Sequence, residues 1–406
     1  MLALFLAPFY ILVGLYMLHW VLRWTGCCHR LCGTRGFRVL FCLVYAFAAL
    51  SPLTGFAVQE PQWLRHTLRQ VSNYWLGWML YLALAILVVE IALFVVRRVR
   101  KKDFIQMQRV RQVQGGVALA LVGAVCVYGM VNAGTLRVTE YEVTLDGAGE
   151  DMTVVLLADL HLGYSTEPDY IERTVDTVNA MQPDLVAIAG DIFDNEYEAV
   201  PEPGRIAAVL ASLQATYGVY ACWGNHDVSE PILAGFTWDT ADADKDDPRM
   251  AAFLEQSGIT LLEDEAVTLG NGVQLAGRKD PSRDKKLGGS RLSPAELLAP
   301  LDQEQPIFVI DHQPKELDEL AAAGADLDLS GHTHDGQVFP GNLLMPLIWD
   351  NPCGHVQAGG MHSVVTSGLG VWGPDMRVGT KSEVVCITVH FTDGCEKNTC
   401  PSEENN

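Results

Sequence analysis

The chain has 406 residues, of which 49% are hydrophobic, and its charge is unevenly distributed. Residues 1–112 carry 13 Lys and Arg against 3 Asp and Glu, whereas residues 113–406 carry 15 against 46. The hydrophobic content excludes an intrinsically disordered chain, which needs low hydrophobicity. The acidic balance of the second part repels phosphate backbones, so we expect no binding of nucleic acid.

Four apolar segments in the first part are long enough to cross a bilayer, which takes about 20 helical residues. No Lys or Arg precedes the first segment, so we interpret it as a retained helix, with a cleaved signal peptide as the alternative. We therefore predict a multi-pass membrane protein with a transmembrane region over residues 1–134. The four segments are approximately 2–22, 39–58, 74–96 and 113–131.

The loops between these segments predict the orientation. The first and third loops carry 4 and 7 Lys and Arg, whereas the second carries 2. The positive-inside rule places the first and third loops in the cytoplasm, so the acidic domain is expected to be extracytoplasmic. If the fourth segment only lies on the membrane, the domain is cytoplasmic instead. Glu90, inside the third segment, is expected to be paired within the bundle, with a proton or substrate role as the alternative.

From about Arg137 onward, short β-branched runs alternate with helical patterns, which is typical of an α/β layer fold. We expect this domain to cover residues 135–392, before a polar tail over 393–406 whose Cys395 and Cys400 could pair. Thr166 is a candidate N-cap, and Asn271-Gly272 marks a hairpin. The expected strands are 153–157, 185–189, 219–222, 307–310 and 327–329, and the expected helices are 168–181, 204–216 and 249–256.

Each of these five strands is followed by carboxylate, amide or imidazole side chains, at the place where open α/β sheets hold their sites. Oxygen and nitrogen donors without cysteine suit manganese, iron or zinc and argue against a closed structural zinc site. Any one of these motifs is common in loops, but the five in this order predict a pair of divalent ions, a standard arrangement for phosphoryl transfer. The candidate residues are Asp159, His161, Asp191, Asn225, His226, Asp227, His312, His332 and His334.

The five motifs are Asp-x-His, Gly-Asp, Gly-Asn-His-Asp, a lone His and Gly-His-x-His. In this order they resemble the calcineurin-like metallophosphoesterase family, in its membrane-linked bacterial branch, over about residues 137–391. The chain has Asp335 where that branch usually has Gly, which leaves the backbone there in question. The four apolar segments lie outside the resemblance.

The resemblance implies a four-layer α/β/β/α sandwich with two central sheets. It also implies two divalent metal ions at the carboxyl ends of the strands. Asp191 would bridge both ions, because a carboxylate has two oxygens to share. The first ion would be bound by Asp159, His161 and His334, and the second by Asn225, His312 and His332.

Two cations would lower the pKa of a shared water, and the resulting hydroxide would attack phosphorus in line with the leaving oxygen. His226 would protonate or stabilise the leaving oxygen, and Asp227 could orient its imidazole. The alternative for His226 is a turn residue without chemistry. Arg377 could clamp a phosphate oxygen or have a structural role.

The expected function is hydrolysis of a phosphate ester, most simply a phosphodiester of a membrane lipid or cell-envelope component. A nucleotide-linked lipid precursor such as UDP-2,3-diacylglucosamine and a catalytically silent membrane receptor are the alternatives, and a nuclease fits the acidic charge poorly. The apolar run from Phe339 to Trp349 is either buried packing or a lip that faces acyl chains or the membrane. Residues 239–247 are expected to form a solvated acidic loop and not a calcium loop.

Overall fold

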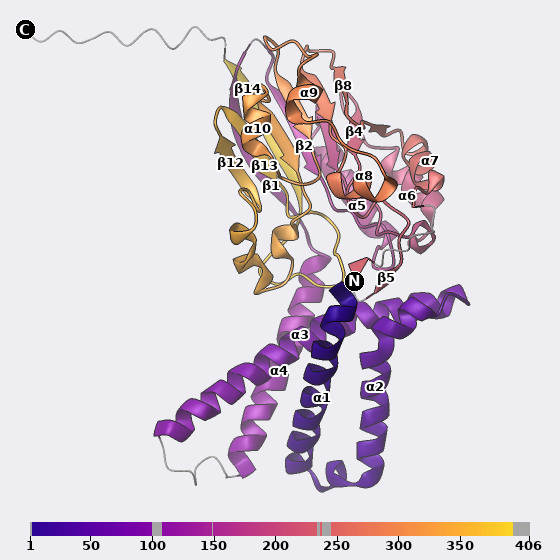
Figure 1. The fold of residues 1–406 in the computed structure, drawn as a ribbon, viewed down its shortest axis with the longest axis vertical. Coiled ribbons are helices and arrows are strands. Elements are labelled where there is room, and N and C mark those ends of the chain that lie inside the picture. Colours follow the sequence, from indigo (N-terminus) through magenta and orange to yellow (C-terminus); the bar gives the residue numbers. More distant parts are fainter. Residues whose placement is uncertain (1, 100–107, 148, 234–235, 238–244, 393–406) are drawn as a thin grey trace, which may run out of the picture. The chain divides into compact units, whose positions relative to one another are not determined.

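The computed structural model describes residues 2–99, 108–147, 149–233, 236–237 and 245–392 (Figure 1). Most of the acidic loop, including Asp242 and Asp244, and the polar tail with Cys395 and Cys400 lie outside the described residues. The chain divides into two compact units. The first consists of Met1–Ala133, Glu230–Ala241 and Trp372–Val378, and the second consists of Gly134–Ser229, Asp242–Val371 and Gly379–Asn406.

The first unit is helical. Among the residues that the structure describes, four helices are long and apolar enough to cross a membrane, as the sequence predicts. Their outward side chains are apolar: Leu12 is 67% exposed and Leu43 is 64% exposed. Hydrocarbon favours such a surface, and helices satisfy their backbone hydrogen bonds internally. The four helices are α1 (Leu2–Cys28), α2 (Arg35–Ala57), α3 (Gln62–Val99) and α4 (Gln108–Ala133).

Polar side chains inside this unit join helix to helix. The Tyr45 hydroxyl donates to the backbone oxygen of Gly14 at 2.7 Å, which links α2 to α1. Glu90 of α3 accepts a hydrogen bond from the indole nitrogen of Trp20 in α1 at 3.3 Å. Glu90 therefore has a partner within the helix bundle, as in the first of its two expected roles.

Two short segments from the second half of the sequence belong to the helical unit. The Arg377 backbone N–H donates to the Gly129 carbonyl of α4 at 3.0 Å, and the Asn132 amide donates to the Arg377 carbonyl at 3.0 Å. Arg69 of α3 donates to the backbone oxygen of Ile232. Arg377 is completely buried, so these contacts favour its structural role.

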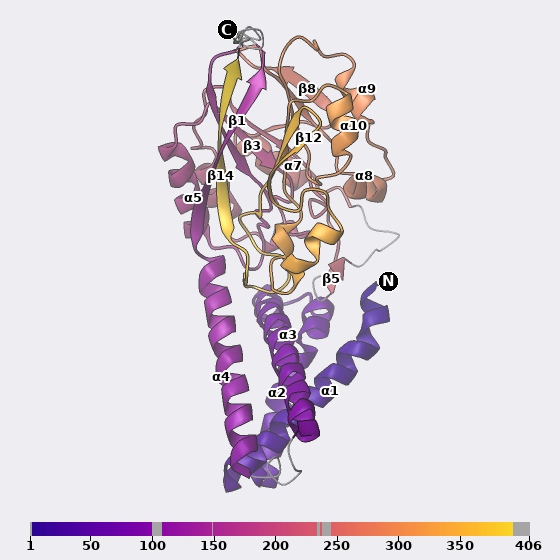
Figure 2. The ribbon, with the colours of Figure 1, turned by 90° about the vertical axis from the view of Figure 1, so that its left-hand side faces the viewer.

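The second unit contains two mixed sheets, each of six strands within the described residues. The order of the first sheet is β1 (Leu136–Asp146), β14 (Ser382–Thr392), β2 (Met152–Leu157), β3 (Leu185–Ala189), β4 (Val219–Cys222) and β7 (Thr260–Leu261). The order of the second is β12 (Gly354–Ala358), β13 (Met361–Val365), β11 (Leu327–Ser330), β10 (Ile307–Ile310), β9 (Gln274–Gly277) and β8 (Glu265–Thr268). The long strands β1 and β14 run parallel at one edge (Figure 2).

The alternation of side chains along the strands builds the layers. Val155 and Leu157 of β2 pack with α5 (Pro168–Ala180), α6 (Pro203–Leu210) and α7 (Pro248–Gln256). Val154 and Leu156 point to the opposite face and pack between the two sheets. Beyond the second sheet, Ile307 and Val309 of β10 pack with α9 (Pro294–Leu298) and α10 (Leu317–Ala322). The order helix, sheet, sheet, helix confirms the predicted four-layer sandwich.

All five predicted strands and the hairpin at Asn271-Gly272 are present, but two local predictions are wrong. The helix expected over 204–216 ends at Leu210, because Asn179 at the end of α5 binds the backbone of Ser212 and Gln214. Thr166 is not the N-cap of α5. Its hydroxyl accepts from Gly163 N and donates to His161 O, and Glu167 occupies the cap position.

Candidate functional site

The predicted site residues lie where strands of both sheets end and loops begin. The strands β2, β3, β4, β10 and β11 are mutually parallel within each sheet, so their carboxyl ends meet at one edge. In chain order the residues are Asp159 and His161 after β2, Asp191 after β3, Asn225, His226 and Asp227 after β4, His312 after β10, and His332 and His334 after β11.

Several of these residues have left-handed backbone conformations, which residues other than glycine rarely adopt. Such residues cost about 1–3 kcal/mol each and cluster at functional sites. Asp335, beside His334, also has a positive φ, of 51°. The aspartate thus adopts the conformation that a glycine would provide. The site residues with positive φ are Asp159 (52°), His161 (45°), Asp191 (48°), His332 (74°) and His334 (50°).

One group of donors consists of Asp159, His161 and His334, all of them buried. One ligand atom from each lies within 4.8 Å of the others. The Nε2 atoms of His161 and His334 are 3.0 Å apart, and His334 Nε2 lies 3.5 Å from Asp159 Oδ1. Nitrogen lone pairs and carboxylate oxygens that converge in this way suit a divalent ion.

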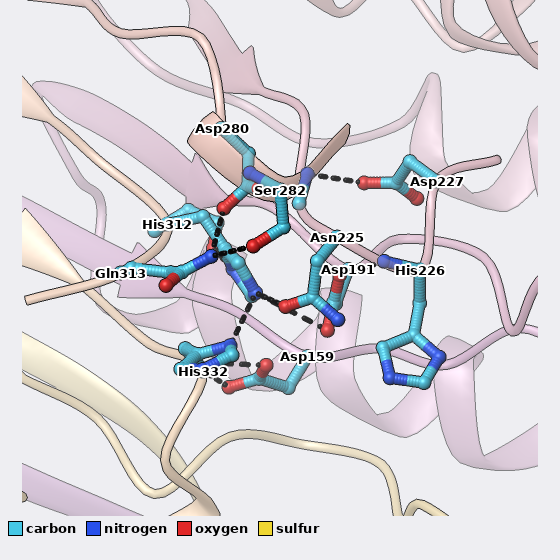
Figure 3. A network of polar contacts seen from close by, with 12 residues as sticks. Asp159, Asp191, Asn225, His226, Asp227, Asp280, Ser282, His312, Gln313 and His332 are labelled. Carbon is cyan, nitrogen blue, oxygen red and sulfur yellow. Dashed lines mark hydrogen bonds and ion pairs between the residues drawn. The ribbon is translucent and has the colours of Figure 1, made fainter. Parts of the chain in front are cut away.

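A second group consists of Asp191, His312 and His332, with Asn225 beside it (Figure 3). His312 Nε2 lies 3.2 Å from Asp191 Oδ2 and 3.1 Å from both Asn225 Oδ1 and His332 Nδ1. The other ring nitrogen of His312 donates to the Ala189 carbonyl at 2.9 Å. In a neutral His312 ring, such a bond selects the tautomer whose Nε2 lone pair faces the group, as metal-binding histidines require.

Asp191 lies between the two groups. Its Oδ2 is 3.2 Å from His312 Nε2 in the second group and 3.8 Å from His161 Nε2 in the first. Its Oδ1 accepts from the His226 backbone N–H at 2.7 Å. The loop of Gly224 approaches closely enough that a Cβ there would lie 2.2 Å from Asp191 Oδ1, so this position requires glycine.

The structure corrects the expected partner of His226. The two oxygens of Asp227 accept from the backbone N–H groups of Phe193 and Gly224 at 2.8 and 2.7 Å, so Asp227 holds the loop and not the imidazole. The Nδ1 atom of His226 contacts the amide oxygen of Asn195. This buried asparagine was not predicted from the sequence. It lies in the loop that follows the Gly190-Asp191 motif, and an asparagine in such a loop has no spacing that marks it as functional.

Asp194 is a second residue that the sequence analysis did not assign. Its Oδ1 lies 3.5 Å from His161 Nδ1 and 3.7 Å from His226 Nδ1. It therefore lies between His161, a candidate metal ligand, and His226. The only signal in the sequence was its place in the run from Gly190 to Asp194, directly after β3.

Burial and mutual charge shift the protonation of the site. Burial acts to raise the pKa of Asp191, but the charges of His312, His226 and His161, with the hydrogen bond to His312, together hold that pKa well below its ordinary value. Conversely, burial acts to lower the pKa of His312, but Asp191, Asp159 and Asp280 together raise it well above its ordinary value. Burial raises the pKa of Asp159 to about 6 and lowers the pKa of His226 to about 4. The pKa values of Asp191 and His312 therefore shift in opposite directions, which favours the charged form of each. Bound cations would neutralise the buried carboxylates in place of these protons.

A network of hydrogen bonds holds the chain neighbours of His312 in place, and Figure 3 shows part of it. The side-chain amide of the next residue, Gln313, donates to Asp280 Oδ2 at 2.6 Å and to Ser282 Oγ at 3.1 Å. On the other side of His312, the Asp311 carboxylate accepts from the buried Arg278 guanidinium at 2.8 Å. These bonds anchor the residues on both sides of His312, and second-layer contacts of this kind orient metal ligands.

Two basic side chains flank the site. The ammonium of Lys315 lies 4.9 Å from the centre of the Trp349 ring, and that ring is 5.1 Å from the His332 ring. The ammonium of Lys286 donates to the Asn225 backbone oxygen at 3.2 Å. Within the acidic second unit, these cations place positive charge where a phosphoryl group would approach.

The domain matches known proteins over most of its length. Residues 152–336 match the calcineurin-like phosphoesterase family. An uncharacterized metallophosphoesterase of Helicobacter pylori is 31% identical over 257 residues, which are 62% of this chain and 63% of that protein. A transmembrane protein with metallophosphoesterase domain from Danio rerio is 29% identical over 287 residues, 67% of this chain and 62% of that protein. A UDP-2,3-diacylglucosamine pyrophosphatase of Chlamydia trachomatis is 23% identical over 220 residues, 46% of this chain and 64% of that protein.

The matched region thus spans less than two thirds of the length of each of these relatives. The second unit is a two-sheet α/β sandwich with clustered imidazoles and carboxylates at its strand ends. Over residues 152–336 the chain is therefore similar to the calcineurin-like phosphoesterase family.

Proposed function

We propose that the chain is a membrane-bound phosphoesterase that uses two divalent ions of manganese, iron or zinc. The observation that carries this proposal is the position of Asp191, whose Oδ2 lies within 3.8 Å of ring nitrogens from both donor groups. A single carboxylate that reaches both groups can hold two ions close together. The proposed ligands are Asp159, His161 and His334 for one ion, Asn225, His312 and His332 for the other, and Asp191 for both.

The ions would supply Lewis acidity toward a phosphoryl oxygen and a lowered pKa for an attacking water. The chain's own residues do the rest. Asn195 holds the ring of His226 in place. We assign His226 to the leaving oxygen, which it would protonate or stabilise. Asp227 fixes the loop that carries His226, and Lys315 neutralises charge on the phosphoryl group.

The test is hydrolysis of bis(p-nitrophenyl) phosphate by the full chain in detergent or lipid nanodiscs. We expect turnover that disappears after chelation and returns with added manganese. A protein that remains inactive with manganese, zinc or iron, although folded, would instead support the catalytically silent receptor. The complete donor set of the site argues against that alternative.

For the substrate, we propose a phosphodiester of a membrane lipid or cell-envelope component. The support is the set of four apolar helices on the same chain, which keeps the catalytic domain at a lipid surface. The second candidate is a nucleotide-linked lipid precursor, which is favoured by the similarity to the UDP-2,3-diacylglucosamine pyrophosphatase. Lipid analysis of a strain that lacks the protein would show which class of phosphoester accumulates.

We further propose that the transmembrane region covers residues 1–134 and that the catalytic domain, residues 135–392, is extracytoplasmic. The support is the excess of Lys and Arg in the first and third loops. A reporter fused after Asp393, together with protease added to intact cells or spheroplasts, tests the orientation. A reporter that is active only in the cytoplasm, with a protected domain, would reverse it and favour the nucleotide-linked substrate.

A further inference from the structure

Directly after the His332 and His334 motif, the chain forms a short apolar projection that we call the lip, residues 339–348. Its two 3-10 turns are η5 (Gly341–Leu343) and η6 (Met345–Leu347). The large side chains of the lip point outward. They are Phe339, Leu343, Leu344, Leu347 and Ile348, which are 44%, 61%, 52%, 81% and 66% exposed. The structure therefore excludes the buried-packing alternative for this run.

The lip is an ordered feature and not a loose loop. Its turns are closed by backbone hydrogen bonds, such as Leu344 N to Gly341 O at 2.8 Å and Leu347 N to Leu344 O at 3.0 Å. At its base, the Thr380 hydroxyl donates to the Gln337 carbonyl at 2.9 Å. Because several backbone N–H groups of the lip are bonded within the turns, fewer backbone polar groups would lose water when the exposed apolar side chains leave it.

The chemistry of the lip and its surroundings indicates what covers it. No charged residue occurs between Asp335 and Asp350, so the whole projection is neutral. At its end lies Trp349, with the Lys315 ammonium 4.9 Å from its ring. Tryptophan and lysine side by side below an apolar tip are typical of groups at the headgroup level of a bilayer. The same chain carries four helices able to cross a membrane, so a bilayer is always within reach of the domain.

We propose that the lip docks into the acyl region of the bilayer, with Trp349 and Lys315 at the headgroup level. Because Trp349 also touches the ring of His332, docking would bring the donor groups to the plane of lipid phosphates. Docking would make lipid phosphoesters of the docked leaflet the substrate class, and this part of the inference rests on the proposed function. The docking itself is testable without catalysis.

The experiment places the photoreactive amino acid p-benzoylphenylalanine at Leu347 of the full chain in nanodiscs of phosphatidylethanolamine and phosphatidylglycerol. The matched control places it at Glu255, an exposed position on α7. After irradiation, mass spectrometry identifies the adducts. We expect lipid adducts at Leu347, in the proportion of the two lipids in the nanodisc, and none at Glu255.

Three other outcomes would overturn the docking. A single lipid species at Leu347 would mean that the lip holds the chain of one bound ligand, and protein adducts would mean that a second copy or another part of the chain covers it. No adduct at all would mean that the lip faces water. Replacing Leu343, Leu344 and Ile348 by serine should reduce the Leu347 adducts to the Glu255 level, whereas Leu292→Ser, an exposed leucine outside the lip, should not.

A parallel assay separates this inference from the proposed function. Hydrolysis of bis(p-nitrophenyl) phosphate, a water-soluble diester, reports on the donor groups alone. Lipid adducts at Leu347 in a protein that never hydrolyses the soluble diester would leave the docking intact and contradict the phosphoesterase. Turnover of the soluble diester without lipid adducts would support the phosphoesterase and contradict the docking.

Discussion

Asp191 and His312 lie 3.2 Å apart, with both side chains buried, and each shifts the pKa of the other in the direction of an ion pair. In the absence of a cation, the proton on His312 supplies the positive charge that Asp191 needs. A divalent ion bound by both residues would replace that proton. Protonation of His312 and binding of a divalent ion would therefore exclude each other.

We therefore predict that metal binding releases a proton and strengthens as pH rises. The pKa of His312 is raised in the folded, metal-free protein, so the pair with Asp191 stabilises that form fully below the ordinary histidine pKa. This stabilisation is lost as pH rises through the raised value, where His312 becomes neutral and able to bind metal. Calorimetric titration with manganese, in buffers of different ionisation enthalpy, measures both effects. Affinity that does not change with pH would contradict the exchange.

His226→Ala is expected to keep its metals and lose turnover mainly on substrates with poor leaving groups. A nitrophenolate leaves without a proton, whereas an alkoxide needs one, and proton transfer contributes typically 10²–10⁴-fold. Asn195→Ala, which frees the ring of His226, should show the same preference to a smaller extent. Steady-state kinetics on a nitrophenyl and an alkyl diester compare the two losses. Equal losses on both substrates would mean that His226 only positions the phosphoryl group.

Asp194→Asn should weaken metal binding although Asp194 is not a proposed ligand. Its carboxylate lies 3.5 Å from His161 Nδ1, and loss of such a second-layer partner typically costs about 10–100-fold in metal affinity. The matched control is Asp169→Asn, an exposed aspartate on α5 paired with Arg205, which should bind metal as the wild type does. Competition with a fluorescent chelator gives the affinities. Wild-type affinity in Asp194→Asn would show that the contact with His161 is incidental.

Asp335 offers a test of backbone strain beside the site. At φ 51°, alanine should be less stable than glycine by roughly 1 kcal/mol, because a Cβ is disfavoured in the left-handed region. The substitutions Asp335→Ala and Asp335→Gly both remove the carboxylate and differ only in this respect. At Glu255, inside the helix α7, the order should reverse, since alanine is the better helix former. Thermal unfolding of the four variants compares the two pairs, and a more stable alanine at 335 would refute the strain.

Short buried strands could be predicted from the sequence, because each is a continuous apolar run bounded by polar residues. The run Leu185–Ala189 is completely buried and matches β3 residue for residue. The edge strand β1 was not predicted as a strand, and most of its residues are exposed. Its pairing with β14 joins segments more than 200 residues apart, and no local signal encodes that contact.

The candidate site shows the same division. Motif residues directly after the strands could be proposed from their order, because the carboxyl ends of the parallel strands β2, β3, β4, β10 and β11 lie at one edge. The contacts of Asn195, Asp194 and Lys315 depend on the paths of separate loops, so their identities could not be read from spacing. For the same reason, the sequence left open whether the run from Phe339 to Trp349 is buried, and the exposure of Leu347 answers that question.

We propose that Asp191 holds two ions together for phosphoester hydrolysis. The most direct test measures bound metal per chain and turnover of bis(p-nitrophenyl) phosphate in the same preparations of the wild type and Asp191→Asn. We expect two ions per wild-type chain, fewer in Asp191→Asn, and a loss of turnover by several orders of magnitude, because the neutral amide cannot bridge two cations. An Asp191→Asn protein that binds two ions and turns over at the wild-type rate would show that Asp191 does not bridge a catalytic pair of ions.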